Sequence, residues 1–377
     1  MDITRSPEES PVSRPISGLT IRGLSAIVLE VPMRFPLGTS AAIVRAAPLL
    51  LVELITEEGI TGRTYLFCYR SSGARAVAAL LEDAVELVRG QRVAPVEIGQ
   101  LLARRFALLA VTGIARMALA ALDGALWDAL AQAAGLPLAT LLGAGPRPIP
   151  AYNSSGLGLM APQAAADEAE LLLERGFGAV KLRLGNSTLA QDIAVTRAVR
   201  ARIPDPVEIF VDYNQALDLP EALKRGLALE GEGVSWLEEP IRHDDLTGCA
   251  ALARDLKLPI QIGENFDGPS QMVQALRAAA CDLVMPDYAR IGGVTGWVQA
   301  AGIAAAYGIP MSSHLLPEVS AHLLAATPTA HWLEYVDWAD AFLEQPLEIK
   351  DGCAVIPDRP GAGLSWDRSA VARLRVA

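Results

Sequence analysis

Short apolar runs alternate with helical patterns through the second half of the chain, and six of these runs end in an ionisable residue. The runs are rich in β-branched and aromatic residues, which is typical of buried strands. They read EIFVD, VSWLE, PIQIGE, DLVMPD, IPMSSH and AHWLE, and they end at Asp212, Glu238, Glu264, Asp287, His314 and Glu334. A strand–helix repeat of 20 to 27 residues predicts a (β/α)₈, TIM-like barrel with these side chains at the C-terminal ends of the strands.

Two further runs complete the eight strands that a barrel needs. They lie at 149–153 and 179–184, ahead of the six already described. Helical patterns separate the strands in the correct alternation, at 162–175, 188–202, 220–230, 270–279 and 294–307. The sequence therefore predicts a barrel domain over residues 141–345.

The first 140 residues follow another pattern. Strands are predicted at 18–31, 48–56 and 63–68, and helices at 73–89, 95–107 and 113–134, where Gly135 and Pro137 end the last helix. This order predicts a separate α+β domain over 18–140, preceded by a flexible tail at 1–17. The final segment, 346–377, has strand and turn signals, and we expect it to pack back on the first domain or to close the barrel base.

Composition narrows the class of function. The net charge is −11, and Lys and Arg form no cluster, so a nucleic-acid partner is not expected. The most apolar stretch, 117–134, is interrupted by Asp123 and Asp128, so no membrane span is expected. Four scattered cysteines without CxxC spacing fit a reducing compartment, and we expect a cytoplasmic protein.

Three of the strand-end carboxylates predict a metal site. Asp212, Glu238 and Glu264 end consecutive strands, so they are expected side by side at one rim of the barrel. Three anions this close repel one another unless a cation lies between them. Each carboxylate alone is more often a helix cap or an ion-pair partner, but the joint pattern favours hard oxygen ligation of Mg²⁺, with Mn²⁺ as a substitute.

The remaining strand-end groups predict proton chemistry beside an anion. Asp287 and His314 end the next two strands, and a carboxylate that orients an imidazole makes His314 a candidate general base. Lys181 and Arg183 lie on one face of the second strand and are expected to bind an anionic substrate. Glu334 is expected either to donate a proton, if its pKa is raised, or to buttress the base. Together these groups favour removal of the proton next to a small carboxylate.

Four stretches resemble the mandelate racemase subgroup of the enolase superfamily. They are VDYNQ at 211–215, WLEEP at 236–240, MPD with IGGVTGW at 285–297, and the stretch from PMSSHL to AHWLE at 310–334. The similarity extends over about residues 18–368. It implies that the first domain caps the barrel, that a loop at 34–46 acts as a flap, that Mg²⁺ binds the three carboxylates, and that the protein forms a homo-octamer.

The resemblance also implies roles in substrate binding. Ser154 and Asn214 would contact the substrate carboxylate and hydroxyl, Lys181 its carboxylate, and Glu334 the developing enolate oxygen. The matching pocket walls are apolar or aromatic, which suits an aryl or apolar substituent, and they are Leu37, Val44, Phe67, Tyr69 and Leu315. Arg183 stands where this subgroup has a second catalytic lysine. Since arginine keeps its proton, a two-base racemisation is weakened on one side.

Three functions remain open from the sequence. The first is racemisation or epimerisation of an aryl or apolar 2-hydroxy acid. The second is dehydration of a sugar acid, in which His314 is the single base and Arg183 only binds. The third is a metal-bound binding protein without catalysis, which the complete set of carboxylates, the Asp–His pair and Lys181 disfavours.

Overall fold

The N-terminal part is a three-stranded antiparallel sheet covered by helices. The computed structural model describes residues 18–38 and 43–376. The sheet has the order β1 (Ile21–Gly38), β2 (Ile43–Thr56) and β3 (Thr61–Phe67). Strands β1 and β2 are longer than predicted and pair as far as Gly38 and Ile43. The described part of the predicted flap is therefore the outer end of these two paired strands. Residues 39–42 of that flap lie outside the described residues.

Helices follow the sheet in the predicted order. They are α1 (Ser71–Val88), α2 (Pro95–Arg105), α3 (Gly113–Ala134) and the single turn α4 (Leu138–Leu141). Helix α3 ends where the sequence predicts, because Gly135 adopts a left-handed conformation with φ of 68°. Helix α3 is alanine-rich and buried on most sides, since it packs against β3 and also against the barrel helices α10 and α11.

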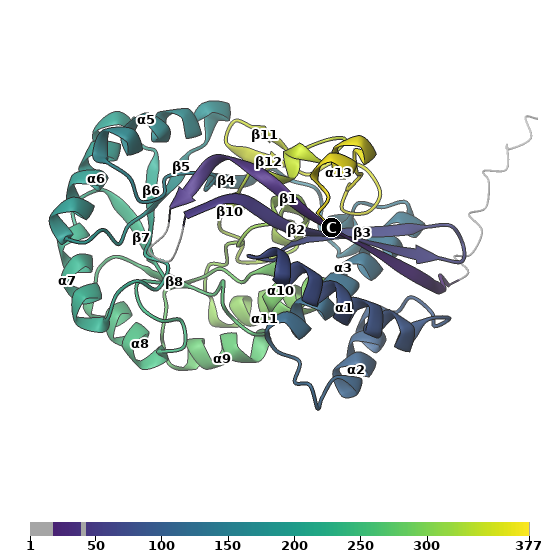
Figure 1. Ribbon diagram of the computed structural model, residues 1–377. Helices are drawn as coiled ribbons and strands as arrows, with labels where there is room; N and C mark the ends of the chain where they lie inside the picture. The colour runs from purple at the N-terminus through teal and green to yellow at the C-terminus, as the bar shows by residue number, and fades with distance from the viewer. Residues whose placement is uncertain (1–17, 39–42, 377) are drawn as a thin grey trace, which may run out of the picture.

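The second part is a ring of parallel strands with helices outside it (Figure 1). The strands are β4 (Ile149–Asn153), β5 (Ala179–Arg183), β6 (Glu208–Asp212), β7 (Val234–Glu238), β8 (Ile260–Ile262), β9 (Leu283–Val284) and β10 (Leu333–Tyr335). The helices are α5 (Pro162–Leu172), α6 (Leu189–Arg202), α7 (Leu219–Leu229), α8 (Leu246–Asp255), α9 (Pro269–Arg277), α10 (Tyr288–Ile291), α11 (Gly293–Tyr307) and α12 (Pro317–Ala325), with 3₁₀ turns η1 (Glu174–Gly176) and η2 (Trp338–Ala341). This is the predicted α/β barrel architecture.

The prediction of a continuous strand over 309–314 is wrong. Met311 makes single parallel bridges to Val284 on one side and Ala330 on the other, and His314 bridges Asp287. Pro310 has no N–H to donate, so a regular ladder is interrupted there. These bridges connect β9 to Ala330, three residues before β10, and β10 pairs with β4.

The C-terminal segment contacts both parts of the molecule. Strand β11 (Glu348–Lys350) pairs with β12 (Cys353–Val355), and β12 pairs antiparallel with β4. Helix α13 (Arg368–Leu374) begins beside the first sheet, where the Arg368 guanidinium lies 2.7 Å from the Glu53 carboxylate. The C-terminal segment therefore has contacts with a barrel strand and with the first sheet. The domain limits at 17, 140 and 345 remain predictions.

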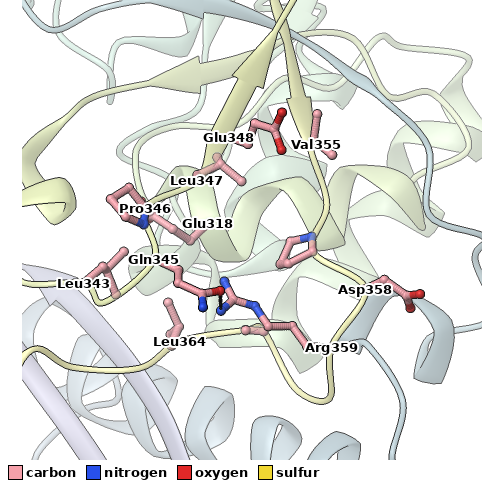
Figure 2. A pocket seen from close by; sticks show the side chains of 13 residues that line it. Glu318, Leu343, Gln345, Pro346, Leu347, Glu348, Val355, Asp358, Arg359 and Leu364 are labelled. Atoms are coloured by element: carbon pink, nitrogen blue, oxygen red, sulfur yellow. Dashed lines mark hydrogen bonds between the residues drawn. The ribbon is translucent and has the colours of Figure 1, made fainter.

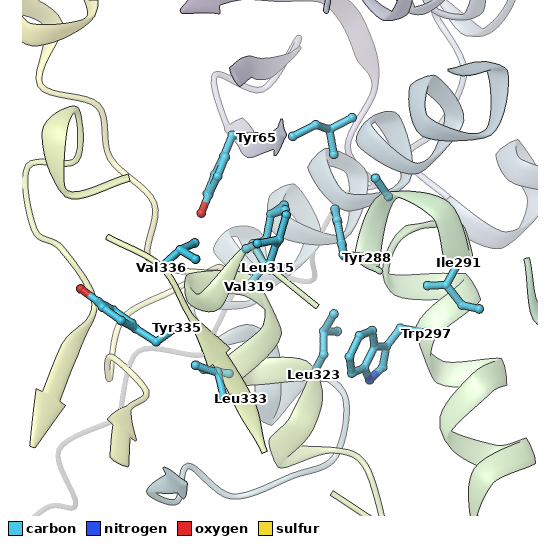
Figure 3. Packing of buried hydrophobic residues seen from close by; sticks show 14 of the residues in the cluster. Tyr65, Tyr288, Ile291, Trp297, Leu315, Val319, Leu323, Leu333, Tyr335 and Val336 are labelled. Carbon is cyan, nitrogen blue, oxygen red and sulfur yellow. The ribbon is translucent and has the colours of Figure 1, made fainter. Parts of the chain in front are cut away.

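One hydrophobic core joins the first sheet to the barrel (Figure 3). Tyr65 reaches from β3 toward the barrel, where Tyr288 of α10, Val319 of α12 and Val336 after β10 belong to the same buried cluster. Burial of this apolar surface holds the sheet over the C-terminal ends of the barrel strands. Within the described residues, no helix is both long enough and apolar enough to cross a membrane.

Candidate active site

Asp212, Glu238 and Glu264 converge at the rim of the barrel. Asp212 ends β6, Glu238 ends β7, and Glu264 lies two residues beyond β8. Each offers one oxygen, and these three oxygens lie within 4.8 Å of one another. Asp212 and Glu238 are almost completely buried, with exposed fractions of 1% and 0%. The structure thus brings together the three side chains predicted as metal ligands.

The charge at this point fits a hard divalent cation. Burial, together with the negative charges of Asp212, Glu334 and Glu264, raises the pKa of Glu238 to about 8 against the opposing effect of Lys181. The Oε2 atom of Glu238 is buried and has no hydrogen-bond partner. A buried carboxylate oxygen without a partner is costly, and a cation shared by several carboxylates removes that cost.

Lys181 is an ammonium group held by carboxylates. Its Nζ lies 2.7 Å from Glu238 Oε1, 2.7 Å from Glu334 Oε1 and 3.3 Å from Asp212 Oδ2. Burial alone would lower its pKa, but Glu238 and Glu334 hold the pKa well above its usual value. The surrounding carboxylates therefore favour the ammonium form of Lys181.

Glu334 is a permanent anion in this arrangement. Burial alone would raise its pKa, but the positive charges of Lys181 and His314 outweigh burial and lower the pKa to about 2. Of the two roles expected for Glu334, the lowered pKa favours support of neighbouring groups over proton donation. Its Oε2 accepts a hydrogen bond from the Leu315 amide at 2.8 Å and lies 3.9 Å from His314 Nε2.

His314 and Asp287 form the predicted pair. His314 Nδ1 lies 2.8 Å from Asp287 Oδ2, and the other Asp287 oxygen accepts hydrogen bonds from the amides of Ala289 and Arg290 at the start of α10. Burial lowers the pKa of His314, but Glu264, Glu334 and Asp287 outweigh it and raise the pKa to about 9. A hydrogen bond from Nδ1 to Asp287 leaves Nε2 as the atom that exchanges a proton.

Arg183 is fixed by oxygen acceptors from the loop after β4. One guanidinium nitrogen donates to the carbonyl of Gly156 at 2.7 Å, and more weakly to the carbonyl of Ser154 at 3.4 Å, and the other donates to the Ser154 hydroxyl at 3.0 Å. Only 6% of Arg183 is exposed. These contacts hold the guanidinium in one orientation.

One cavity of about 260 Å³ joins these groups to an apolar wall. The five predicted wall residues all line it, as do Lys181, Arg183, Asp212, Asn214, Glu264, His314 and Glu334. Ser154 does not line it, because its side chain is fully buried behind Arg183. Asn214 donates to Asp212 Oδ2 at 2.9 Å. Sequence reasoning missed Met33 and Trp338, which complete the apolar wall, although Trp338 follows Glu334 by four residues.

Comparison with known families agrees with this geometry. Residues 164–370 match the family model described as enolase C-terminal domain-like. Residues 24–143 match the N-terminal domain model of mandelate racemase and muconate lactonizing enzyme. The protein belongs to the enolase superfamily. It is therefore an enzyme, in a superfamily that contains both isomerases and dehydratases.

Solved relatives in the superfamily contain magnesium. An enolase from the alpha proteobacterium bal199 with bound magnesium shares 44% identity, with a TM-score of 0.93 over 95% of this chain and 100% of that one. A Bradyrhizobium enolase in complex with magnesium and mandelic acid shares 40% identity, with a TM-score of 0.91 over 96% of this chain and 99% of that one. L-talarate/galactarate dehydratase of Salmonella typhimurium is 32% identical over 85% of this chain and 81% of its own length.

Proposed function

We propose that the protein dehydrates a 2,3-dihydroxy carboxylate that carries an apolar terminal group, with His314 as the single acid–base residue. The observation that carries this proposal is the state of Arg183. Its guanidinium donates hydrogen bonds to two carbonyls and a hydroxyl, and a guanidinium group has no lone pair with which to accept a proton. The pKa of Lys181 is held high, so Lys181 keeps its proton. Among the described residues that line the cavity, we therefore infer that His314 is the base.

His314 acts twice in the proposed reaction. Glu264 is the largest of the charges that raise the pKa of His314, and a cation bound by Glu264 would lower that pKa. The neutral imidazole then takes the α-proton of the substrate on Nε2, and the electrons of the broken C–H bond move into the carboxylate to give an enediolate. Those electrons then expel the 3-hydroxyl, which leaves as water after receiving the proton from Nε2. The resulting enol tautomerises to a 2-keto-3-deoxy acid. Asp287 keeps the ring in one orientation and stabilises its charged form through both steps.

Asp212, Glu238 and Glu264 would hold the metal. A bound Mg²⁺ would neutralise these carboxylates and stabilise negative charge on the substrate carboxylate. Lys181 places a second positive charge at the same end of the cavity, and Glu334 keeps Lys181 in position at 2.7 Å. Arg183 lies in another part of the cavity wall and would bind a substrate oxygen there.

The two halves of the cavity support the choice of substrate. One half carries the charged and amide side chains, which suit a carboxylate and two hydroxyl groups. The other half is built from hydrocarbon and aromatic side chains, among them Leu37, Val44 and Phe67. A polyol would leave its hydroxyl groups without partners there, whereas a methyl, alkyl or aryl end group is compatible with it.

Racemisation of an aryl 2-hydroxy acid is the second candidate. The apolar wall favours it, as does the mandelic acid bound to the Bradyrhizobium relative. Product analysis separates the two candidates. We expect the Mg²⁺-loaded enzyme to form a keto acid from 2,3-dihydroxy acids with apolar ends, faster than from aldarates. Inversion of a 2-hydroxy acid without any keto acid from the panel would establish racemisation instead.

Replacing Arg183 with lysine is expected to create inversion activity. Burial at this position would lower the pKa of a lysine, which can lose its proton where arginine cannot, so the variant would gain a second base. We expect R183K to interconvert the enantiomers of mandelate in D₂O, as monitored by polarimetry and ¹H NMR. The matched variant Arg183→Gln has no base and should not invert mandelate. Equal inversion by the unaltered enzyme would show that Arg183 already transfers protons.

A further inference from the structure

Arg290 contacts several groups of the active site, although it is not among the residues that line the active-site cavity. It belongs to the single turn α10, which begins directly after Asp287. Its backbone amide donates to Asp287 Oδ1 at 2.9 Å, and the other oxygen of that carboxylate holds His314. The backbone of Arg290 is therefore anchored beside the pair of Asp287 and His314.

The guanidinium of Arg290 fixes the side-chain amide of Asn265. Its Nη1 donates to Asn265 Oδ1. The Nδ2 atom of the same amide donates to the two oxygens of Glu239 at 2.8 and 2.9 Å, and to Glu264 Oε1 at 3.2 Å. A side-chain amide has one accepting end and one donating end, so a donor at Oδ1 turns the N–H groups toward the two carboxylates.

The reversed orientation of the Asn265 amide would disturb the metal cluster. Its oxygen would then face two carboxylates, and Glu239 has an exposed fraction of 0%. A buried carboxylate that loses its hydrogen-bond donor is destabilised. Glu264 would be affected as well, and its other oxygen, Oε2, lies 3.3 Å from His314 Nε2. The orientation of this amide therefore bears on the position of a carboxylate that belongs to the metal cluster.

The ring of Tyr69 also holds the Arg290 guanidinium in place. The central carbon of the guanidinium lies 4.8 Å from the centroid of the ring, and a cation over an aromatic face is attracted to it. The ring itself packs against Phe67, with 4.6 Å between the centroids. The guanidinium thus has two fixed partners, Tyr69 and Asn265, which come from different parts of the molecule.

We infer that Arg290 is a positioning residue of the metal site, which orients the carboxylate of Glu264 through the side-chain amide of Asn265. The inference rests on the metal site proposed above, and it does not depend on the choice between dehydration and racemisation.

The charge of Arg290 alone predicts the opposite effect on metal binding. Burial would lower the pKa of Arg290, but the negative groups around it, among them Asp287 and Glu264, raise that pKa. A positive charge close to these carboxylates repels a divalent cation, so its removal should by itself strengthen Mg²⁺ binding. A weakening of Mg²⁺ binding on removal of Arg290 would therefore come from the lost orientation and not from the lost charge.

Calorimetric titration of Arg290→Met with Mg²⁺ tests the inference. We expect an affinity at least about tenfold weaker than that of the unaltered protein, since residues that support metal ligands contribute roughly 10–100-fold. Arg290→Lys keeps a charged donor for Asn265 Oδ1 and should bind Mg²⁺ more tightly than R290M. Unchanged or tighter binding by R290M, or equal weakening in R290K, would overturn the inference.

A double-mutant cycle tests whether Arg290 acts through Asn265. Asn265→Ala alone should weaken Mg²⁺ binding by about tenfold, and this result tests the inference even if R290M does not fold. Without the amide there is nothing to orient, so R290M added to N265A should not weaken binding further. Unchanged affinity in N265A, or the same loss from R290M in both backgrounds, would show that Arg290 does not act through Asn265.

A matched arginine controls for loss of the bond type in general. Arg359 also donates to a side-chain amide oxygen, that of Gln345, in a cavity beside the C-terminal segment (Figure 2). None of the residues that line that cavity lines the active-site cavity. Arg359→Met should leave Mg²⁺ affinity unchanged, and a loss as large as that of R290M would overturn the inference.

Glu238→Gln, titrated in the same way, separates this inference from the proposed metal site. If E238Q binds Mg²⁺ weakly and R290M, shown to be folded by circular dichroism, binds it normally, the metal site stands and Arg290 does not position it. If neither variant weakens binding, the carboxylate cluster is not the metal site and both proposals fail.

Discussion

The variant His314→Asn is expected to turn over substrate at least about 10³-fold more slowly than the unaltered enzyme. General acid–base catalysis by one side chain contributes roughly 10²–10⁴-fold, and His314 is assigned both the removal and the return of the proton. Asparagine approximates the size of the imidazole and can still donate to Asp287, but it has no basic nitrogen. The measurement is kcat for keto-acid formation at saturating Mg²⁺.

The loss must come from proton transfer and not from a damaged metal site. We therefore expect H314N to bind Mg²⁺ with nearly unchanged affinity. The matched variant His243→Asn alters a half-buried histidine that does not line the active-site cavity, and it should retain most of its activity. A loss of less than about tenfold in H314N would be smaller than the contribution of one acid–base residue, and another group would then have to be the base.

The second large effect is expected from Glu238→Gln. Glu238 is completely buried, lies with Asp212 and Glu264 in one cluster, and has one oxygen without a partner. The amide keeps the size of the side chain but removes its negative charge. We expect metal affinity to fall by more than about 100-fold, since even residues that only support metal ligands are worth 10–100-fold. Calorimetric titration with Mg²⁺ measures the affinity, and we expect Mn²⁺ also to bind E238Q more weakly than the unaltered protein.

Activity should follow metal occupancy. Chelation of the metal is expected to abolish turnover by the unaltered enzyme, and added Mg²⁺ to restore it, whereas E238Q should recover only at much higher Mg²⁺. Glu318→Gln changes another buried glutamate, outside the cluster, and should leave Mg²⁺ affinity unchanged. If E238Q bound Mg²⁺ as tightly as the unaltered protein, the three carboxylates would not be the metal site.

The sequence was sufficient to predict which ionisable groups meet. Asp212, Glu238 and Glu264 close successive βα units, and the topology of a parallel barrel brings such positions to one rim whatever the side-chain details. The same reasoning predicted the pair of Asp287 and His314. Positions of this kind depend on strand order and on the direction of the backbone, and both can be read from periodic apolar runs.

Side-chain orientation was not predictable to the same degree. Lys181 reaches three carboxylates, and Arg183 turns to the carbonyls of the neighbouring loop, so two cations on one strand face have different partners. Ser154 is covered by Arg183, and the segment containing Pro310 makes bridges where a strand was expected. These outcomes depend on tertiary packing and hydrogen-bond competition, for which spacing along the chain carries no signal.

The most direct test of the account follows α-proton exchange of the two mandelate enantiomers separately. Mandelate has no 3-hydroxyl group to lose, so it reports proton removal alone. With Mg²⁺-loaded enzyme in D₂O, ¹H NMR should show that one enantiomer exchanges its α-proton for deuterium and keeps its configuration, while the other remains unlabelled, because His314 reaches only one face. Exchange of both enantiomers at similar rates, or of neither, would contradict a single histidine base at this site.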